Sequence, residues 1–123
     1  MVGGGTVKKD LKKAIQYYVK ACELNEMFGC LSLVSNSQIN KQKLFQYLSK
    51  ACELNSGNGC RFLGDLYRSG DGVKQNLTKA AQFYSKACKL GLQEACEDAQ
   101  NIEVRDKKHV IASPRNYPTK ALF

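Results

Sequence analysis

The segment ACELNEMFGC, residues 21–30, has three copies in this chain. It returns almost unchanged as ACELNSGNGC at residues 51–60 and more loosely as ACKLGLQEAC at residues 87–96. Each copy holds two cysteines eight positions apart. Such a pair can be a set of metal ligands, a redox centre, a nucleophile with a spare thiol, or a structural bridge. The sequence around the copies has to separate these four roles.

The residues in front of each copy are repeated as well. VKKDLKKAIQYYVKAC (residues 7–22) and VKQNLTKAAQFYSKAC (residues 73–88) agree at ten of sixteen positions, and KLFQYLSKAC (residues 43–52) has the same ending. Equivalent cysteines therefore lie 30 and 36 residues apart. A period of this length is typical of helical repeats, in which similar units stack on one another.

Each unit is expected to contain two helices joined by a turn. Apolar residues recur at spacings of three and four from Leu11 to Cys22, with lysines on the opposite face, which is the pattern of an amphipathic helix. Asp10 and Asn76 stand where N-caps are needed. A second helix should begin near the second cysteine of each copy and, in the middle unit, end at SGDG, residues 69–72.

Two places depart from the repeat. The link between the first and second units is six residues shorter than the next link, measured between cysteines, so the turn near residues 35–42 should be tighter. After Cys96 the apolar pattern fails, so that the last helix is either an atypical cap or the point where the array is interrupted. Residues 104–123 match no unit and carry five basic side chains against one acid. This basic tail is expected to be disordered or divergent.

The arrangement GDGVKQNLTKAAQFYSKAC, residues 70–88, resembles the Sel1-like repeat, a relative of the tetratricopeptide repeat. With cysteine pairs in register with the repeat, the chain is similar to the Helicobacter cysteine-rich proteins, a Sel1-like family with one disulfide per repeat. The resemblance covers about residues 5–100. It implies an all-α fold, a right-handed α/α superhelix of about three helix–turn–helix repeats. The expected divisions are an array over residues 5–103, with units near 5–30, 31–60 and 61–96 plus a cap helix, and the tail 104–123.

The family resemblance also implies how the cysteines pair. Cysteines that face each other on neighbouring helices, whose axes lie about 8–10 Å apart, fall within reach of a disulfide. Zinc knuckles use shorter cysteine spacings and further ligands, and His109 is the one histidine. The spacing is also not the C-x-x-C of redox centres, and the repeated positions supply no base for a nucleophile. The expected bridges are Cys22–Cys30, Cys52–Cys60 and Cys88–Cys96.

Three disulfides indicate an oxidising compartment, so the protein is expected to be secreted or periplasmic, although no signal peptide is visible in this chain. No apolar run is long enough to span a membrane. The formal net charge of +8 favours anionic partners, but no nucleic-acid motif accompanies it. We expect a monomer without cofactor or metal, and no nucleic-acid partner.

The resemblance implies an activity, namely penicillin binding and slow β-lactam hydrolysis. Serine β-lactamases need Ser-x-x-Lys and K-T-G elements, and neither is present in the sequence. Metallo-β-lactamases need several histidine ligands, and the chain has one histidine. No catalytic residue is therefore assigned.

The alternative function is a scaffold that binds an extended peptide, a protein or a peptidoglycan fragment without turnover. In the middle unit Arg61, Asp65 and Arg68 follow each other at i, i+4 and i+7, opposite the apolar face. They form a candidate ligand-binding stripe. The simpler interpretation is a solvated helix face stabilised by i,i+4 charge pairs.

Overall fold

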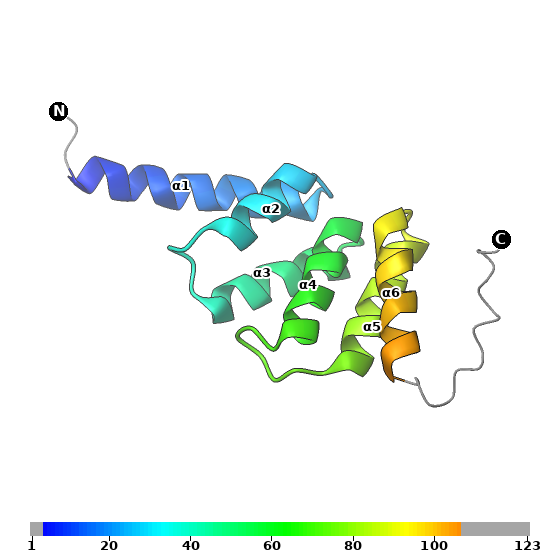
Figure 1. Ribbon diagram of the computed structural model, residues 1–123. Helices are drawn as coiled ribbons and strands as arrows, with labels where there is room; N and C mark the ends of the chain where they lie inside the picture. Colours follow the sequence, from blue (N-terminus) through cyan, green and yellow to red (C-terminus); the bar gives the residue numbers. More distant parts are fainter. Residues whose placement is uncertain (1–3, 107–123) are drawn as a thin grey trace.

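The computed structural model describes residues 4–106, and the side chains of residues 10–102. These residues form six helices and no strand (Figure 1). The helices are α1 (Gly4–Glu23), α2 (Met27–Ser35), α3 (Lys41–Glu53), α4 (Gly57–Ser69), α5 (Leu77–Lys89) and α6 (Gln93–Asp106). Consecutive helices pair, as α1 with α2, α3 with α4 and α5 with α6, and the three pairs stack in chain order (Figure 1). The expected all-α repeat fold is confirmed, while the predicted tail lies outside the described residues from position 107 onward.

The turn inside each unit is built in the same way three times. The residue after the repeated leucine has a left-handed backbone, with φ of 66° at Asn25, 70° at Asn55 and 104° at Gly91. Asparagine and glycine tolerate this conformation better than other residues. The next amide then donates back to the carbonyl of the repeated alanine, as from Glu26 N to Ala21 O at 2.9 Å. This bond closes the end of the first helix and reverses the chain.

Side-chain caps begin three of the helices. The side chains of Asn40, Ser56 and Asn76 accept hydrogen bonds from backbone amides at the starts of α3, α4 and α5. The cap predicted at Asn76 is confirmed, but the one predicted at Asp10 is wrong, because α1 begins at Gly4 and Asp10 lies inside it. The residues directly before Asp10 are a valine and two lysines, which a helix accommodates without a break.

The shorter link between the first two units shortens a helix as well as a loop. α2 has 9 residues where α4 has 13, so four of the six missing residues come from the helix and two from the connection that follows it. As a result α2 makes little contact with α3, whereas α4 packs along the whole of α5. The second and third units therefore share the more extensive interface.

Small residues let the two helices of a unit approach closely. A Cβ added to Gly29 would lie 2.6 Å from Ala21 Cβ, and one added to Gly59 would lie 2.7 Å from Ala51 Cβ. The third unit has Ala95, fully buried, at the equivalent place. Ala95 and Ile102 bury one side of α6, so the last segment forms a helix of the array despite its departure from the repeat pattern.

Within residues 4–106, no helix combines the length and the apolar character that crossing a membrane requires.

Candidate functional site

All six cysteines are joined within their own units. The bonds are Cys22–Cys30 (S–S 2.02 Å, Cα–Cα 4.5 Å), Cys52–Cys60 (2.06 Å, 4.4 Å) and Cys88–Cys96 (1.96 Å, 4.7 Å). The first two bonds are fully buried, and the third is partly exposed. A sulfur bound to another sulfur offers no thiolate for catalysis or metal binding. In this state the cysteines hold helices together.

The three residues of the candidate stripe lie on the side of α4 that faces α5 and α6. Arg61 Nε donates to Asp98 Oδ2 of α6 at 2.9 Å. Asp65 accepts a hydrogen bond from the hydroxyl of Tyr84 on α5. The structure therefore brings the three residues to one surface, but it joins two of them to neighbouring helices rather than leaving them on a solvated face.

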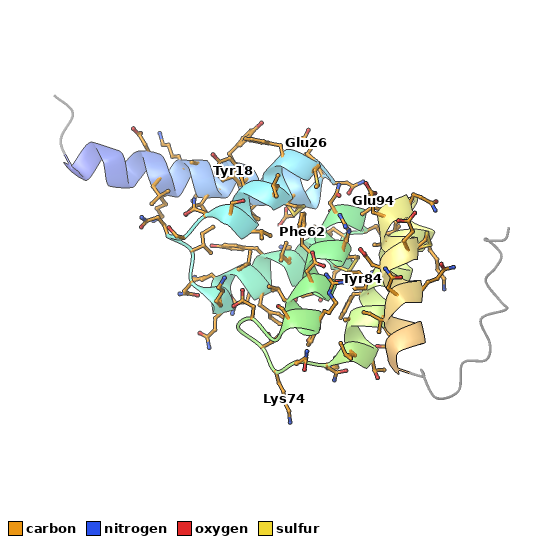
Figure 2. All side chains as sticks on the ribbon, viewed as in Figure 1. Tyr18, Glu26, Phe62, Lys74, Tyr84 and Glu94 are labelled. Atoms are coloured by element: carbon orange, nitrogen blue, oxygen red, sulfur yellow. A yellow bond between two sulfur atoms is a disulfide. The ribbon has the colours of Figure 1, made fainter. Side chains whose placement is uncertain are left out.

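Arg68 completes this group. Its Nη2 lies 3.7 Å from Asp65 Oδ1, and its guanidinium lies over the Tyr84 ring, 5.6 Å from the ring centroid. The ion pair within α4 thus joins residues three apart, while Arg61 turns to α6. We call Arg61, Asp65, Arg68, Tyr84 and Asp98 the polar cluster, and Figure 2 shows its Tyr84 where α4 meets α5 and α6.

Sequence reasoning missed two members of the polar cluster. Tyr84 carries a signal, because it aligns with Tyr18 in the repeat, but the alignment does not show that its hydroxyl has a carboxylate partner. Tyr84 is fully buried, and its hydroxyl donates a hydrogen bond to Asp65. Asp98 carries no signal, since its partner Arg61 lies 37 residues earlier and the two meet only because the third unit stacks on the second.

Burial sets the protonation behaviour of the cluster. It raises the pKa of the Asp65 carboxyl above its ordinary 3.8, although the Tyr84 hydrogen bond and the two arginines oppose the rise. Burial and the adjoining carboxylate raise the pKa of Tyr84 far above 10, so its hydroxyl stays protonated and remains a donor. Burial lowers the pKa of Arg61, but the hydrogen bond and charge of Asp98 outweigh it, and Arg61 stays charged.

Part of the cluster is open to solvent. The side chains of Arg68 and Asp65 are 43% and 35% exposed, against 25% and 17% for Arg61 and Asp98. A loosely paired guanidinium can bind an anionic group. A carboxylate of raised pKa next to it can accept a proton. The Arg61–Asp98 pair is better suited to holding α4 against α6.

A second group of contacts joins α5 to α4 and to the end of α3. The Phe83 ring stacks on Tyr67 with centroids 5.7 Å apart, and Lys79 Nζ lies 5.5 Å from the centroid of Tyr67. Lys86 Nζ donates to the carbonyl oxygen of Cys52 at 3.0 Å. Aromatic and lysine side chains of α5 therefore fasten the third unit to the second.

The chain matches the family model described as the Sel1 repeat. The match covers residues 1–26, 40–56 and 57–92, which is more than half of the chain. These segments begin and end near the helix ends described above.

Two matches from Helicobacter pylori, a curated sequence and a solved structure, extend the comparison. A relative named "Beta-lactamase HcpB" is 90% identical over 81 residues, which cover 66% of this chain and 59% of the relative. The solved structure of "Helicobacter pylori cysteine rich protein B (hcpB)" superposes with a TM-score of 0.77 at 77% identity, covering 85% of this chain and 78% of that one. The chain thus spans less than two thirds of the length of the curated relative that it matches, and the resemblance to the cysteine-rich repeat proteins is confirmed.

Proposed function

We propose that this chain, which belongs to the Sel1 repeat family, is a disulfide-bridged repeat protein that binds β-lactams and opens their ring slowly. The observation that carries the proposal is the 90% identity to a protein named a β-lactamase. That identity extends over 66% of this chain. It includes at least part of the helical array, where the polar cluster lies.

The protein is proposed to work outside the reducing cytoplasm, in the periplasm or after secretion. Three disulfides in a chain of this size persist in an oxidising compartment and are rare where thiols are kept reduced. The bridges Cys22–Cys30 and Cys52–Cys60 support an oxidising compartment further, because they are buried and form part of the hydrophobic core.

The polar cluster is the proposed site. The carboxylate that penicillins carry next to their ring would pair with Arg68, whose side chain is the most exposed of the cluster. Asp65 lies beside it and would take a proton from the attacking water. The Tyr84 hydroxyl, donating to Asp65, holds that carboxylate in one orientation.

The reaction balances with water alone. The water oxygen bonds to the carbonyl carbon of the lactam while Asp65 removes its proton, and the carbon–nitrogen bond of the ring then breaks. The proton passes from Asp65 to the released nitrogen, which restores the carboxylate. A general base by itself contributes typically 10²–10⁴-fold, far below what a full β-lactamase site achieves, and slow turnover follows.

Nitrocefin hydrolysis by the oxidised protein tests this site. Asp65→Asn should lower kcat/KM at least tenfold, because the amide cannot accept the proton. Arg68→Ala should mainly raise KM. The base must be ionised, so kcat/KM should rise with pH through a pKa above the ordinary 3.8, and Asp65→Asn should abolish that rise. Asp71→Asn, in the exposed turn after α4, is the matched control and should behave as wild type.

Two results would remove the proposal. Turnover that disappears on repurification would identify a contaminating lactamase. Turnover that survives Asp65→Asn unchanged, with the same pH profile, would place the chemistry elsewhere or nowhere on this protein.

A second candidate is a scaffold that binds a peptidoglycan fragment or an extended peptide without chemistry. Sel1 repeats typically mediate protein interactions, and the chain has this repeat over most of its length. Saturable binding of fluorescent penicillin, competed by a peptidoglycan stem peptide but without ring opening, would favour this function. Arg68→Ala should weaken both ligands if they share the cluster.

A further inference from the structure

The outer face of the first unit, on the side away from the second unit, exposes large apolar side chains. Tyr17, Leu24 and Phe28 are 60%, 67% and 63% exposed. Exposed apolar patches of this kind mark interaction sites. We define the outer face as Lys13, Tyr17, Tyr18, Lys20, Leu24 and Phe28.

Four of these residues align with the residues of the third unit that hold α4. The alignment follows from the repeat, in which each residue of the first unit has its counterpart 66 positions later. The pairs are Lys13 with Lys79, Tyr17 with Phe83, Tyr18 with Tyr84, and Lys20 with Lys86.

In the third unit, each of these four positions makes a defined contact with the second unit. Phe83 and Lys79 both engage the ring of Tyr67. The Tyr84 hydroxyl donates to Asp65, and Lys86 donates to a carbonyl oxygen at the end of α3. The outer face therefore carries an aromatic ring, a phenol and two lysines of a surface that, in the same chain, binds a helix.

In the second unit, neither the tyrosine nor the carboxylate of this contact is present. There the residue equivalent to Tyr84 is Leu48, which has no hydroxyl. The helix before it, α2, has Ser35 at the position of Asp65 and ends there. Where the preceding helix offers no carboxylate, the chain has no phenol. The phenol of Tyr18 on the outer face thus points to an occupant that offers one.

We propose that the outer face binds an α-helix of a partner protein with the pattern of α4. That pattern is a small residue, a carboxylate directly after it, and an aromatic residue two positions further, as in Gly64, Asp65 and Tyr67. The small residue is required because a Cβ on Gly64 would lie only 2.8 Å from the Tyr84 ring. The carboxylate would accept from Tyr18, and the aromatic ring would stack on Tyr17 under Lys13.

A second copy of this chain fits the face less well. Its α6 has Gln100 and Asn101 at the positions of Gly64 and Asp65, so it lacks both the small residue and the acid. Two outer faces placed together would oppose their lysines, which repel. A helix of another protein fits the face better than a second copy does, and the proposal does not depend on β-lactam binding.

A helical peptide with the sequence of residues 57–69, hydrocarbon-stapled, fluorescein-labelled and carrying Cys60→Ser, is the probe. We expect saturable binding to the oxidised protein by fluorescence anisotropy. Tyr18→Phe should weaken it about tenfold or more, the typical effect of losing a hydrogen bond to a charged group. Asp65→Asn in the peptide should weaken it similarly, and the two changes together should cost little more than either alone.

The matched control is a leucine at the equivalent turn of the second unit. Leu24→Ala should weaken binding, whereas Leu54→Ala, also an exposed leucine, should not. No binding, equal loss from both leucine variants, or full additivity of Tyr18→Phe and the peptide Asp65→Asn would overturn the proposal. Sedimentation of the protein as a dimer that Tyr17→Glu dissociates would assign the face to a second copy and also overturn it.

Discussion

Replacing both cysteines of the middle bridge, Cys52→Ala with Cys60→Ala, should lower the free energy of unfolding by about 2–3 kcal/mol. The chain-entropy model gives this value for a loop closed over so few residues. The loss corresponds to a fall in melting temperature of roughly 10–20 °C for a domain of this size. Reduction of all three bridges removes an amount that rivals the whole stability of a small domain, so the reduced protein should be largely unfolded.

The bridge of the third unit, Cys88–Cys96, provides the comparison. The loop that Cys88 and Cys96 close is as long as the middle one, so the entropic loss is equal, but this bridge is partly exposed and leaves a smaller void. The middle double variant should therefore be the less stable of the two in urea unfolding followed by circular dichroism. A fully reduced protein with the melting temperature of the oxidised form would show that the bridges do not stabilise this fold.

Glycine-to-alanine changes two residues apart on α4 should have opposite signs. A Cβ on Gly59 would meet Ala51 Cβ at 2.7 Å, so Gly59→Ala must push α3 and α4 apart and should cost about 1–3 kcal/mol. A Cβ on Gly57 would have its nearest neighbour at 3.6 Å, an ordinary contact. There the helical preference of alanine should add up to about 1 kcal/mol.

Denaturant unfolding of the two variants beside the wild type measures both effects. The cost at Gly59 arises because α3 and α4 approach closely there: the Cα atoms of Cys52 and Cys60 are 4.4 Å apart, against 4.7 Å for the bridge of the third unit, where Ala95 takes the equivalent position. If both variants shifted stability in the same direction, the close approach of α3 and α4 would not be what fixes glycine at position 59.

The parts of the fold that the sequence predicts are those with a local and repeated cause. The helices follow from apolar spacing, and the cap at Asn76 follows from its position before an apolar run. The cap at Asp10 failed for a related reason, because cap residues also occur inside helices and only the upstream chain decides between the two. The turn near residues 35–42 was expected to be tighter, but the sequence alone did not show that four of the six missing residues come from α2.

The candidate site was predictable only in its local half. The spacing of Arg61, Asp65 and Arg68 places them along one side of a helix, and this could be read directly. Their partners Tyr84 and Asp98 come from two other helices, and how these helices stack on α4 is decided by packing among small residues such as Gly64. A charge pattern on one helix cannot reveal a partner that tertiary packing supplies.

Peptide mapping under non-reducing conditions, after trapping free thiols at acidic pH, tests most directly whether each unit is closed by its own disulfide. The predicted result is three bridged fragments, Cys22–Cys30, Cys52–Cys60 and Cys88–Cys96, in a protein six hydrogen atoms lighter than its reduced form. A bridge between units, such as Cys30–Cys60, or a trapped thiol at any of the six positions, would contradict it.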